Sequence, residues 1–277
     1  MPAAPHFDGS HTHIGVFDSG LGGLSVLRAL HARMPLADIS YVADSGHAPY
    51  GERAADFIVE RSQAICDVLL AQQVDAIVVA CNTATAAAIH LLRQRHPQVP
   101  IIGVEPGVKP AVARSARRRV GVVATPATLA SDKYQRLIET HAKDALIVAQ
   151  ACPGLAAEIE KGRLDTPELR ALVQTFTVPL KAAQVDTVVL GCTHYPFVAP
   201  IFQEALGPGV EVIDTAVAVA EHTARLCALH APQRAQDKPA STGALHLWTS
   251  GSPPHLQDVA RAWLGLEAQV QALHAEA

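Results

Sequence analysis

Two cysteines follow two similar apolar segments of the chain, and both are candidates for proton-transfer chemistry. Cys81 comes directly after the segment VDAIVVA, and Cys192 comes directly after the segment VDTVVLG. A cysteine takes up a proton as the thiolate and gives one as the thiol, so it can serve as a general base or a general acid. The pair therefore predicts a site in which two thiols act on one substrate.

Each of these segments is typical of a buried parallel strand, because apolar, largely β-branched residues run through it without alternation. In open α/β sheets, ligands bind beyond the carboxyl ends of such strands, where Cys81 and Cys192 stand. A predicted helix follows each cysteine, and the positive end of a helix would lower the pKa of the thiol toward neutrality. His194, close to Cys192, and Asp18, at the end of a neighbouring strand, are the expected helpers.

The two strands that precede the cysteines belong to a larger internal similarity. The segment IGVFDSG at 14–20 is similar to VGVVATP at 120–126, each a short apolar strand that runs into a turn of small residues. These strands lie roughly 106 residues apart, and the cysteine-bearing strands roughly 111, a spacing that suits duplicated domains rather than short repeats. The sequence thus predicts two related halves, with one thiol facing the site from each half.

Strand and helix patterns alternate along the chain, as they do in α/β folds. The expected fold class is α/β, with two pseudo-symmetric domains, each a parallel sheet with helices on both faces, and the active site between them. The first domain is expected at 14–104 together with 212–277, and the second, inserted domain at 105–211. Residues 1–13 are expected to form a disordered leader. Strands are expected at 14–17, 39–42, 76–80, 101–104, 120–123, 146–149, 188–190, 210–213 and 245–249. Helices are expected at 24–32, 54–70, 84–95, 131–141, 153–161 and 167–183, with two more in the tail.

Composition narrows the function classes. The 277 residues carry 22 lysines and arginines against 26 aspartates and glutamates, which does not favour nucleic acid or a membrane as the main partner. No apolar stretch reaches the roughly 20 residues of a membrane span, and 1–13 lacks the apolar core of a signal peptide. Five cysteines without a framework spacing favour a reducing compartment, so the expected location is the cytoplasm. Three of them are interpreted as small hydrophobic core residues: Cys66, Cys152 and Cys227.

A glycine-rich motif, DSGLGG at 18–23, ends the first strand and opens the first helix. Its backbone amides and the helix N-terminus could hold a carboxylate or a phosphate. The spacing is not the dinucleotide-binding fingerprint. The alternative interpretation is a tight strand-to-helix turn in which Asp18 acts as a cap.

Four motifs in this order resemble those of the glutamate racemases: DSGLGG at 18–23, ADSGHAPYG at 43–51, ACNTAT at 80–85 and LGCTHYP at 190–196. The resemblance extends over nearly the whole chain, through VIDTAVAVA at 212–220 to TSGSP near the C-terminal end. It implies racemisation of glutamate without pyridoxal phosphate, any other cofactor or a metal, and a supply of D-glutamate for peptidoglycan. One cysteine, as thiolate, would remove the α-proton while the other, as thiol, reprotonates the opposite face.

The same resemblance implies roles for individual residues. Cys81 and Cys192 match the acid/base thiols, assisted by Asp18 and His194 respectively, and Tyr50 with Gly51 matches a segment that meets the side-chain carboxylate. The implied substrate-binding set is Asp18, Ser19, Tyr50, Gly51, Asn82, Thr83, Thr193 and His194. Further candidates for the α-carboxylate are Thr125 and Thr128, which could instead cap a helix. An acidic residue that would support His194 is less clear in this chain, and Glu160 is the better guess, left outside the expected site.

Several alternatives stay open. A sister enzyme of the same fold could act on aspartate, and a binding module without activity is the third class. Some members of the family bind DNA gyrase, so a partner-binding, gyrase-inhibiting role is also left open. A homodimer is a separate alternative that the sequence leaves open. A nucleophile pair of Cys192 with His194 is disfavoured because it leaves Cys81 without a role, and metal is disfavoured because no further ligand falls at zinc spacing. A run of arginines is interpreted as a solvated helix end rather than a nucleic-acid surface: Arg114, Arg117, Arg118 and Arg119.

Overall fold

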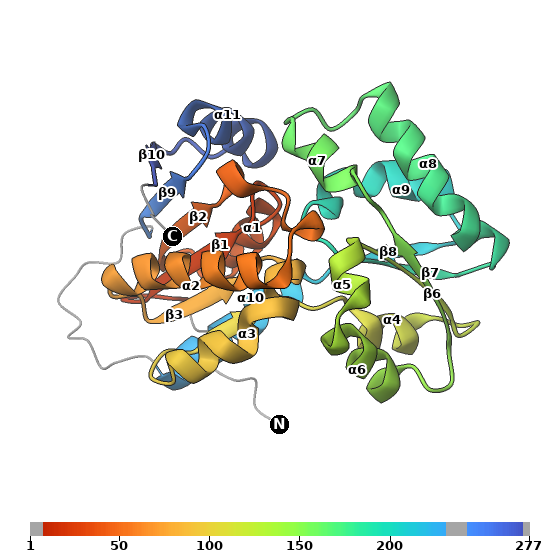
Figure 1. Ribbon diagram of the computed structural model, residues 1–277, viewed down its shortest axis with the longest axis horizontal. Coiled ribbons are helices and arrows are strands. Elements are labelled where there is room, and N and C mark those ends of the chain that lie inside the picture. The colour runs from red at the N-terminus through yellow and green to blue at the C-terminus, as the bar shows by residue number, and fades with distance from the viewer. Residues whose placement is uncertain (1–7, 231–242, 274–277) are drawn as a thin grey trace.

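Two parallel sheets organise the chain. The computed structural model describes residues 8–230 and 243–273, and Figure 1 shows the two sheets side by side with helices packed on them. Every strand pairing within both sheets is parallel. The expected α/β fold class with two parallel-sheet domains is therefore confirmed.

The first sheet combines strands from both ends of the chain, in the order β10-β9-β2-β1-β3-β4. One of its two central strands, β1 (His13–Asp18), carries an apolar run whose side chains are buried on both faces of the sheet, as expected for a parallel strand covered by helices. The strands are β1 (His13–Asp18), β2 (Asp38–Ala43), β3 (Ala76–Val79), β4 (Ile101–Gly103), β9 (Leu245–Thr249) and β10 (Val270–Ala272).

Helices cover both faces of this sheet, and alternate residues of β1 point to different sides. Ile14 and Val16 belong to the core under α1, α10 and α11, whereas Phe17 belongs to the core under α2 and α3. The two cores are thus separated by the sheet, as the period of two along a strand requires. The helices are α1 (Leu24–Arg33), α2 (Ala55–Ala71), α3 (Asn82–Arg95), α10 (Ala216–His230) and α11 (Pro253–Leu264), with short 3₁₀ turns η1 (Ser45–His47) and η2 (Tyr50–Glu52).

The second sheet has the order β6-β5-β7-β8 and also has helices on both faces. Its strands are β5 (Arg119–Ala124), β6 (Leu146–Ala151), β7 (Thr187–Leu190) and β8 (Glu211–Ile213). Its helices are α4 (Val108–Arg114), α5 (Pro126–Ala130), α6 (Asp132–His141), α7 (Leu155–Glu160), α8 (Pro167–Ala182) and α9 (Ala199–Leu206), and η3 (Tyr195–Val198) is a 3₁₀ turn.

The structure differs from the expected boundaries at two places. β8 pairs with β7, so the second sheet extends to Ile213 and crosses the expected boundary between 211 and 212. Within the expected leader, residues 1–7 lie outside the described residues, Thr12 is buried, and His13 already begins β1. The elements that the sequence did not predict are short or close to another element: α4, α5, α9 and β10.

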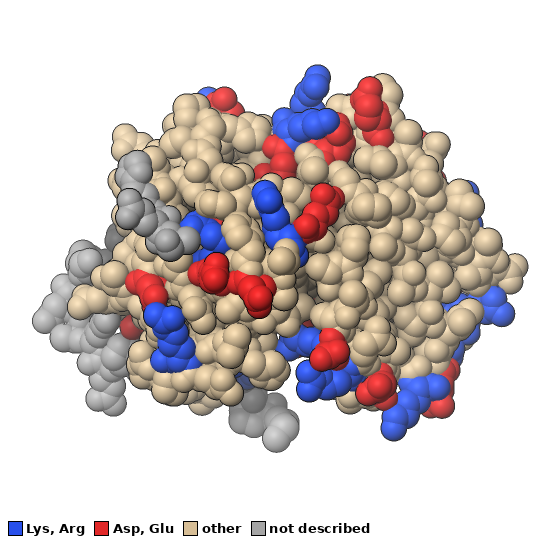
Figure 2. All heavy atoms as spheres, viewed as in Figure 1, with Lys and Arg blue, Asp and Glu red and all other residues tan. Residues whose placement is uncertain are grey.

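Charged side chains of both signs are mixed on the surface. Figure 2 shows lysines and arginines next to acidic residues on the face in view. In the arginine run, Arg114 ends α4 with its side chain 57% exposed and forms an ion pair with Glu211, which agrees with a solvated helix end. Among the described residues, no helix has the length and apolar character needed to cross a membrane.

Candidate active site

The two cysteines lie just beyond the carboxyl ends of β3 and β7, each the neighbour of a central strand in its own sheet. Cys81 is 5% exposed and Cys192 is 7% exposed. A charge on Cys192 raises the pKa of Cys81, so the two thiols from different domains lie within electrostatic reach of each other. The fold thus brings together the residues that the sequence singled out first.

Cys81 occupies the N-cap position of α3. Its sulfur accepts a hydrogen bond from the Ala84 amide at 3.4 Å and lies 3.5 Å from the Ser19 hydroxyl. Burial raises the pKa of the Cys81 thiol, the charge of Asp18 raises it further, and the helix amide opposes both only in part. The expectation that the helix end brings this thiol toward neutrality is therefore wrong: desolvation outweighs the helix dipole.

Cys192 has a histidine beside it rather than an α-helix N-terminus, because the 3₁₀ turn η3 follows it. The His194 Nδ1 lies 3.5 Å from the Cys192 sulfur, and His194 Nε2 lies 2.5 Å from Glu160 Oε1. Burial lowers the pKa of His194, but the charges and hydrogen bonds of Cys192 and Glu160 outweigh burial and raise it well above its ordinary value. His194 is thus placed between the Cys192 sulfur and the Glu160 carboxylate, with one ring nitrogen toward each.

Glu160 also joins the two domains through the glycine-rich turn. Its Oε1 accepts a hydrogen bond from the Leu21 amide at 2.6 Å, while Asp18 Oδ2 accepts one from the Gly23 amide at 2.6 Å. Two amides of this turn, which were candidates for holding a substrate anion, therefore bind the protein's own carboxylates. The cap-like role of Asp18, the alternative interpretation, describes its contact with Gly23.

The glycines of this turn allow the second domain to approach closely. A Cβ atom on Gly20 would lie 2.1 Å from Glu160 Oε1, and one on Gly22 would lie 2.3 Å from His194 Nδ1. Real Cβ atoms do not come this close to another heavy atom. The DSGLGG motif is therefore needed for contact between the domains.

Asp18 is completely buried, which gives a pH-dependent prediction. Burial raises the pKa of its carboxyl, His194 opposes the rise and Glu160 adds to it. Because the folded protein holds this proton more tightly than the unfolded chain, ionised Asp18 costs stability once the pH exceeds its ordinary pKa of 3.8. We expect the unfolding free energy of Asp18→Asn, relative to that of the parent protein, to increase as the pH rises from about 4 to about 7.

Urea unfolding at a series of pH values measures this difference. Asp258→Asn is the matched control, because Asp258 is an exposed carboxyl on α11. A difference between Asp18→Asn and the parent that stays constant with pH would contradict the prediction.

Three threonine hydroxyls meet where the domains touch. Thr83 Oγ1, at the start of α3, lies 3.0 Å from Thr125 Oγ1 and 3.3 Å from Thr128 Oγ1. Thr125 also caps α5, accepting a hydrogen bond from the Thr128 amide, as the cap interpretation of this residue expects. A Cβ on Gly51 would lie 2.8 Å from Thr125, which places the Tyr50–Gly51 segment against the same threonines.

Asn82 brings an unused donor to this region. Its Nδ2 is buried without a hydrogen-bond partner. A small cavity is lined by Asn82 together with Cys192 and Thr193 from the second domain. An unpaired buried amide is costly, so Asn82 is suited to donate to a ligand that enters between the domains.

Tyr50 is held from behind by a polar network that the sequence did not predict. Its hydroxyl donates to Asp44 Oδ2 at 2.5 Å, and Asp44 also accepts two hydrogen bonds from Arg61 and one from Ser250. Burial raises the pKa of Asp44, but these donors outweigh it and lower the pKa below its ordinary value. The Tyr50 hydroxyl is therefore committed to Asp44, which fixes the segment that carries Gly51.

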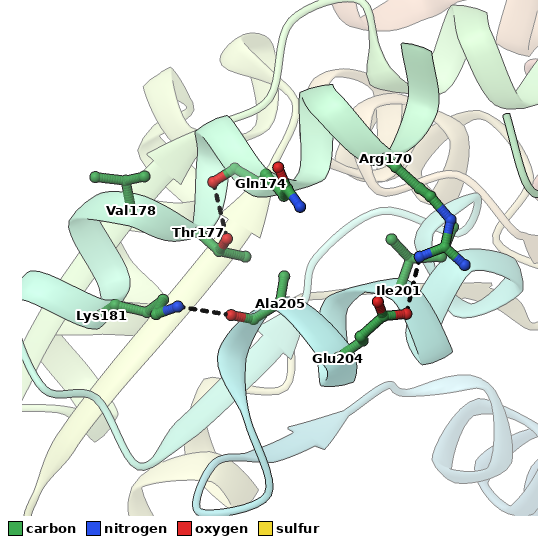
Figure 3. Close-up of a pocket in the computed structure, with 8 residues that line it drawn as sticks. All are labelled: Arg170, Gln174, Thr177, Val178, Lys181, Ile201, Glu204 and Ala205. Atoms are coloured by element: carbon green, nitrogen blue, oxygen red, sulfur yellow. Dashed lines mark hydrogen bonds and ion pairs between the residues drawn. The ribbon is translucent and has the colours of Figure 1, made fainter. Parts of the chain in front are cut away.

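A further pocket is lined by none of the candidate site residues. A cavity of about 470 Å³ opens between α8 and α9, and Figure 3 shows Arg170 reaching Glu204 and Lys181 reaching the Ala205 carbonyl along it. No cysteine or histidine lines it. Within the described ranges, no group of three His, Cys, Asp or Glu side chains is placed to hold a metal ion. We therefore place the candidate site at the two thiols.

Comparisons with known proteins agree on one family. The family model for Asp/Glu/hydantoin racemases matches residues 24–223. A glutamate racemase from Ectopseudomonas mendocina is 48% identical over 264 residues, covering 94% of this chain and 98% of the relative. The structure of Escherichia coli glutamate racemase in complex with L-glutamate and the activator UDP-MurNAc-ala matches with a TM-score of 0.84 at 30% identity, covering 96% of this chain and 99% of that one. A Francisella tularensis glutamate racemase in complex with D-glutamate matches with a TM-score of 0.82 at 25% identity, covering 96% and 98%.

Proposed function

This chain belongs to the Asp/Glu/hydantoin racemase family, and on that premise we propose that it interconverts L- and D-glutamate through Cys81 and Cys192 without a cofactor. The observation that carries the proposal is the pair of buried thiols, one from each domain. Each thiol has its own polar partners: Ser19 and Asp18 on one side, His194 and Glu160 on the other.

The proposed reaction moves two protons. One sulfur, as thiolate, takes the proton from the α-carbon, and the electron pair stays on the substrate as a carbanion delocalised into its carboxylate. The other sulfur, as thiol, gives its proton to the opposite face of the α-carbon. After the reaction, the first sulfur is a thiol and the second is a thiolate. Because the α-proton is very weakly acidic, hydrogen-bond donors must stabilise the carbanion in a pocket without water, a role suited to Asn82, Thr83 and Thr193.

The surroundings of the two sulfurs differ. The raised pKa of Cys81 favours the thiol there. Beside Cys192, the raised pKa of His194 favours a protonated imidazole, whose Nδ1 lies 3.5 Å from the sulfur. The two sulfurs thus have different partners for the two halves of the proposed reaction.

The substrate is proposed to lie between the polar groups of both domains. Asp18 and Ser19 would meet the ammonium group, which also offsets the cost of a buried carboxylate at Asp18. The three linked threonine hydroxyls would exchange their mutual bonds for a substrate carboxylate, and Tyr50–Gly51 would meet the side-chain carboxylate. Since both thiols are more than nine-tenths buried, glutamate must enter by separation of the domains, followed by closure that excludes water.

The proposed physiological role is to supply D-glutamate for peptidoglycan in the cytoplasm. The relatives named glutamate racemase support glutamate over aspartate. An aspartate racemase of the same fold is the second candidate, because the thiol chemistry itself does not distinguish the two acids.

Circular dichroism of each amino acid tests the proposal. L-Glutamate and L-aspartate are incubated separately with the protein under reducing conditions with no cofactor added, and D-glutamate is run as the reciprocal start. We expect the signal to decay to zero for both enantiomers of glutamate only. Decay for aspartate alone would transfer the chain to the sister enzyme, and no decay with either acid would overturn the racemase assignment.

A further inference from the structure

The last long helix of the chain crosses to the second domain and contacts the end of α7, which carries Glu160. Figure 1 shows α11 beside α7 at the junction of the domains. His255 Nε2 lies 2.8 Å from the backbone carbonyl oxygen of Glu160, and the indole nitrogen of Trp263 donates to the carbonyl of Gly162 at 3.3 Å. Helix α11 therefore contacts the backbone carbonyls of both Glu160 and Gly162.

The backbone at Gly162 is shaped for this contact. Its φ is +84°, a conformation that favours glycine, and a Cβ there would lie 3.2 Å from both His255 and Val259. The chain thus turns away from α7 directly against α11, and a side chain at this position would press on His255 and Val259.

An aromatic pair holds the segment that follows His194 at the same junction. Trp263 packs against the cores of both domains, and its ring centroid lies 4.3 Å from that of Phe197. Phe197 lies three residues after His194 in η3 and packs against the core of the first domain, with the Arg28 guanidinium 5.9 Å from its ring. Helix α11 thus contacts both chain segments that meet in the Glu160–His194 pair.

We propose that α11 is a clamp between the domains, and that His255 and Trp263 are positioning residues for the Cys192 side of the site. They act through Glu160, whose carboxylate contacts His194 Nε2, while His194 Nδ1 contacts the Cys192 sulfur. Because a carbonyl oxygen only accepts, His255 Nε2 is the donor in the contact with Glu160. This inference rests on the proposed racemase function.

The clamp predicts a specific kinetic effect. Loss of the His255 contact frees the last turn of α7 and moves Glu160 and His194, whereas the proposed substrate contacts at Asp18, Ser19 and Thr83 stay in the first domain. Since small misplacements of a proton-transfer group lower the rate of chemistry, we expect His255→Ala to reduce kcat about 10-fold with KM changed less than about 2-fold. His255→Gln keeps an N–H donor and should restore kcat to within about 3-fold of the parent.

Kinetics with both enantiomers measure these changes. Trp263→Phe, which keeps the ring contact with Phe197 but loses the N–H donor, serves as a second variant that preserves packing. The control is His246→Ala, an exposed histidine of β9 that makes no contact with α7. Unchanged kcat in both His255→Ala and Trp263→Phe would overturn the clamp. So would a parallel rise in KM without rescue by His255→Gln, the result of a purely structural role.

Amide hydrogen exchange separates this inference from the racemase proposal. In His255→Ala we expect faster exchange in residues 155–162 than in the parent, whether or not the protein racemises glutamate. If the parent protein lacked racemase activity but His255→Ala still exchanged faster than the parent, the clamp would stand and the proposed function would not. Equal exchange in parent and variant would overturn the clamp itself.

Discussion

Cys81→Ser and Cys192→Ser are each expected to lower the rate of glutamate racemisation at least about 1,000-fold, within the range that positioned acid and base groups contribute. Serine is close to cysteine in size, so the buried site keeps its shape. Its hydroxyl does not ionise near neutral pH, and one face of the substrate then lacks its proton carrier. Circular dichroism of L- and D-glutamate measures the loss.

Exchange of the α-proton with solvent distinguishes a mechanism in which each thiol serves one enantiomer from a mechanism in which a single thiol serves both. In deuterium oxide, the sulfur that remains in each variant should still exchange the α-proton of one enantiomer without inverting it. The two variants should exchange opposite enantiomers, which mass spectrometry or proton NMR detects. Cys227→Ala, in α10 and part of the first domain's hydrophobic core, is the control and should keep activity. Racemisation near the parent rate in either serine variant would refute the two-thiol mechanism.

Gly22→Ala is expected to lower kcat/KM at least about 100-fold, because misplacing a catalytic group by roughly 1 Å already costs that much. The new methyl group would lie 2.3 Å from His194 Nδ1, 2.6 Å from Cε1 and 2.8 Å from Cγ. His194 is only 2% exposed, so its ring has no free space to move into. Either the imidazole loses its contact with the Cys192 sulfur or the two domains move apart. Steady-state racemisation kinetics measure the effect.

Two other glycines make this test specific. Gly20→Ala displaces only the flexible end of the Glu160 side chain, so we expect a smaller loss of kcat/KM with little loss of stability. Gly209→Ala adds a methyl group in open space and is the matched control. If Gly22→Ala and Gly209→Ala were equally active, the close approach of the turn to His194 would be irrelevant to catalysis.

Much of the fold could be predicted from local patterns. The runs before Cys81 and Cys192 are long and apolar, so they predict buried strands whatever their surroundings. α5 has only five residues, and β10 has only three, so neither carries enough periodicity to be recognised. The paired motifs identified which residues gather at one edge of each sheet, because parallel strands bring their carboxyl ends together.

The partners across the domains were harder to predict, because they depend on packing. Glu160 is 34 residues from His194 and 139 from Leu21, the two groups that its carboxylate contacts. Asp44 lies within a motif that was noticed, but nothing local indicates that its donors come from α2 and from the turn after β9. The predicted direction of the pKa shift of Cys81 is wrong for the same reason, because the burial of a side chain depends on the complete fold.

The first sheet is built from two distant parts of the chain, and this fixes the order in which the protein can be completed during synthesis. All four strands of the second sheet lie between residues 119 and 213, so that domain can form while the ribosome is still adding residues. The outer edge of β2 is covered by β9, which is synthesised about 200 residues later. Until then, the uncovered edge of β2 is able to pair with another chain. The growing chain therefore carries an uncovered edge on β2 until residues 245–249 have been added.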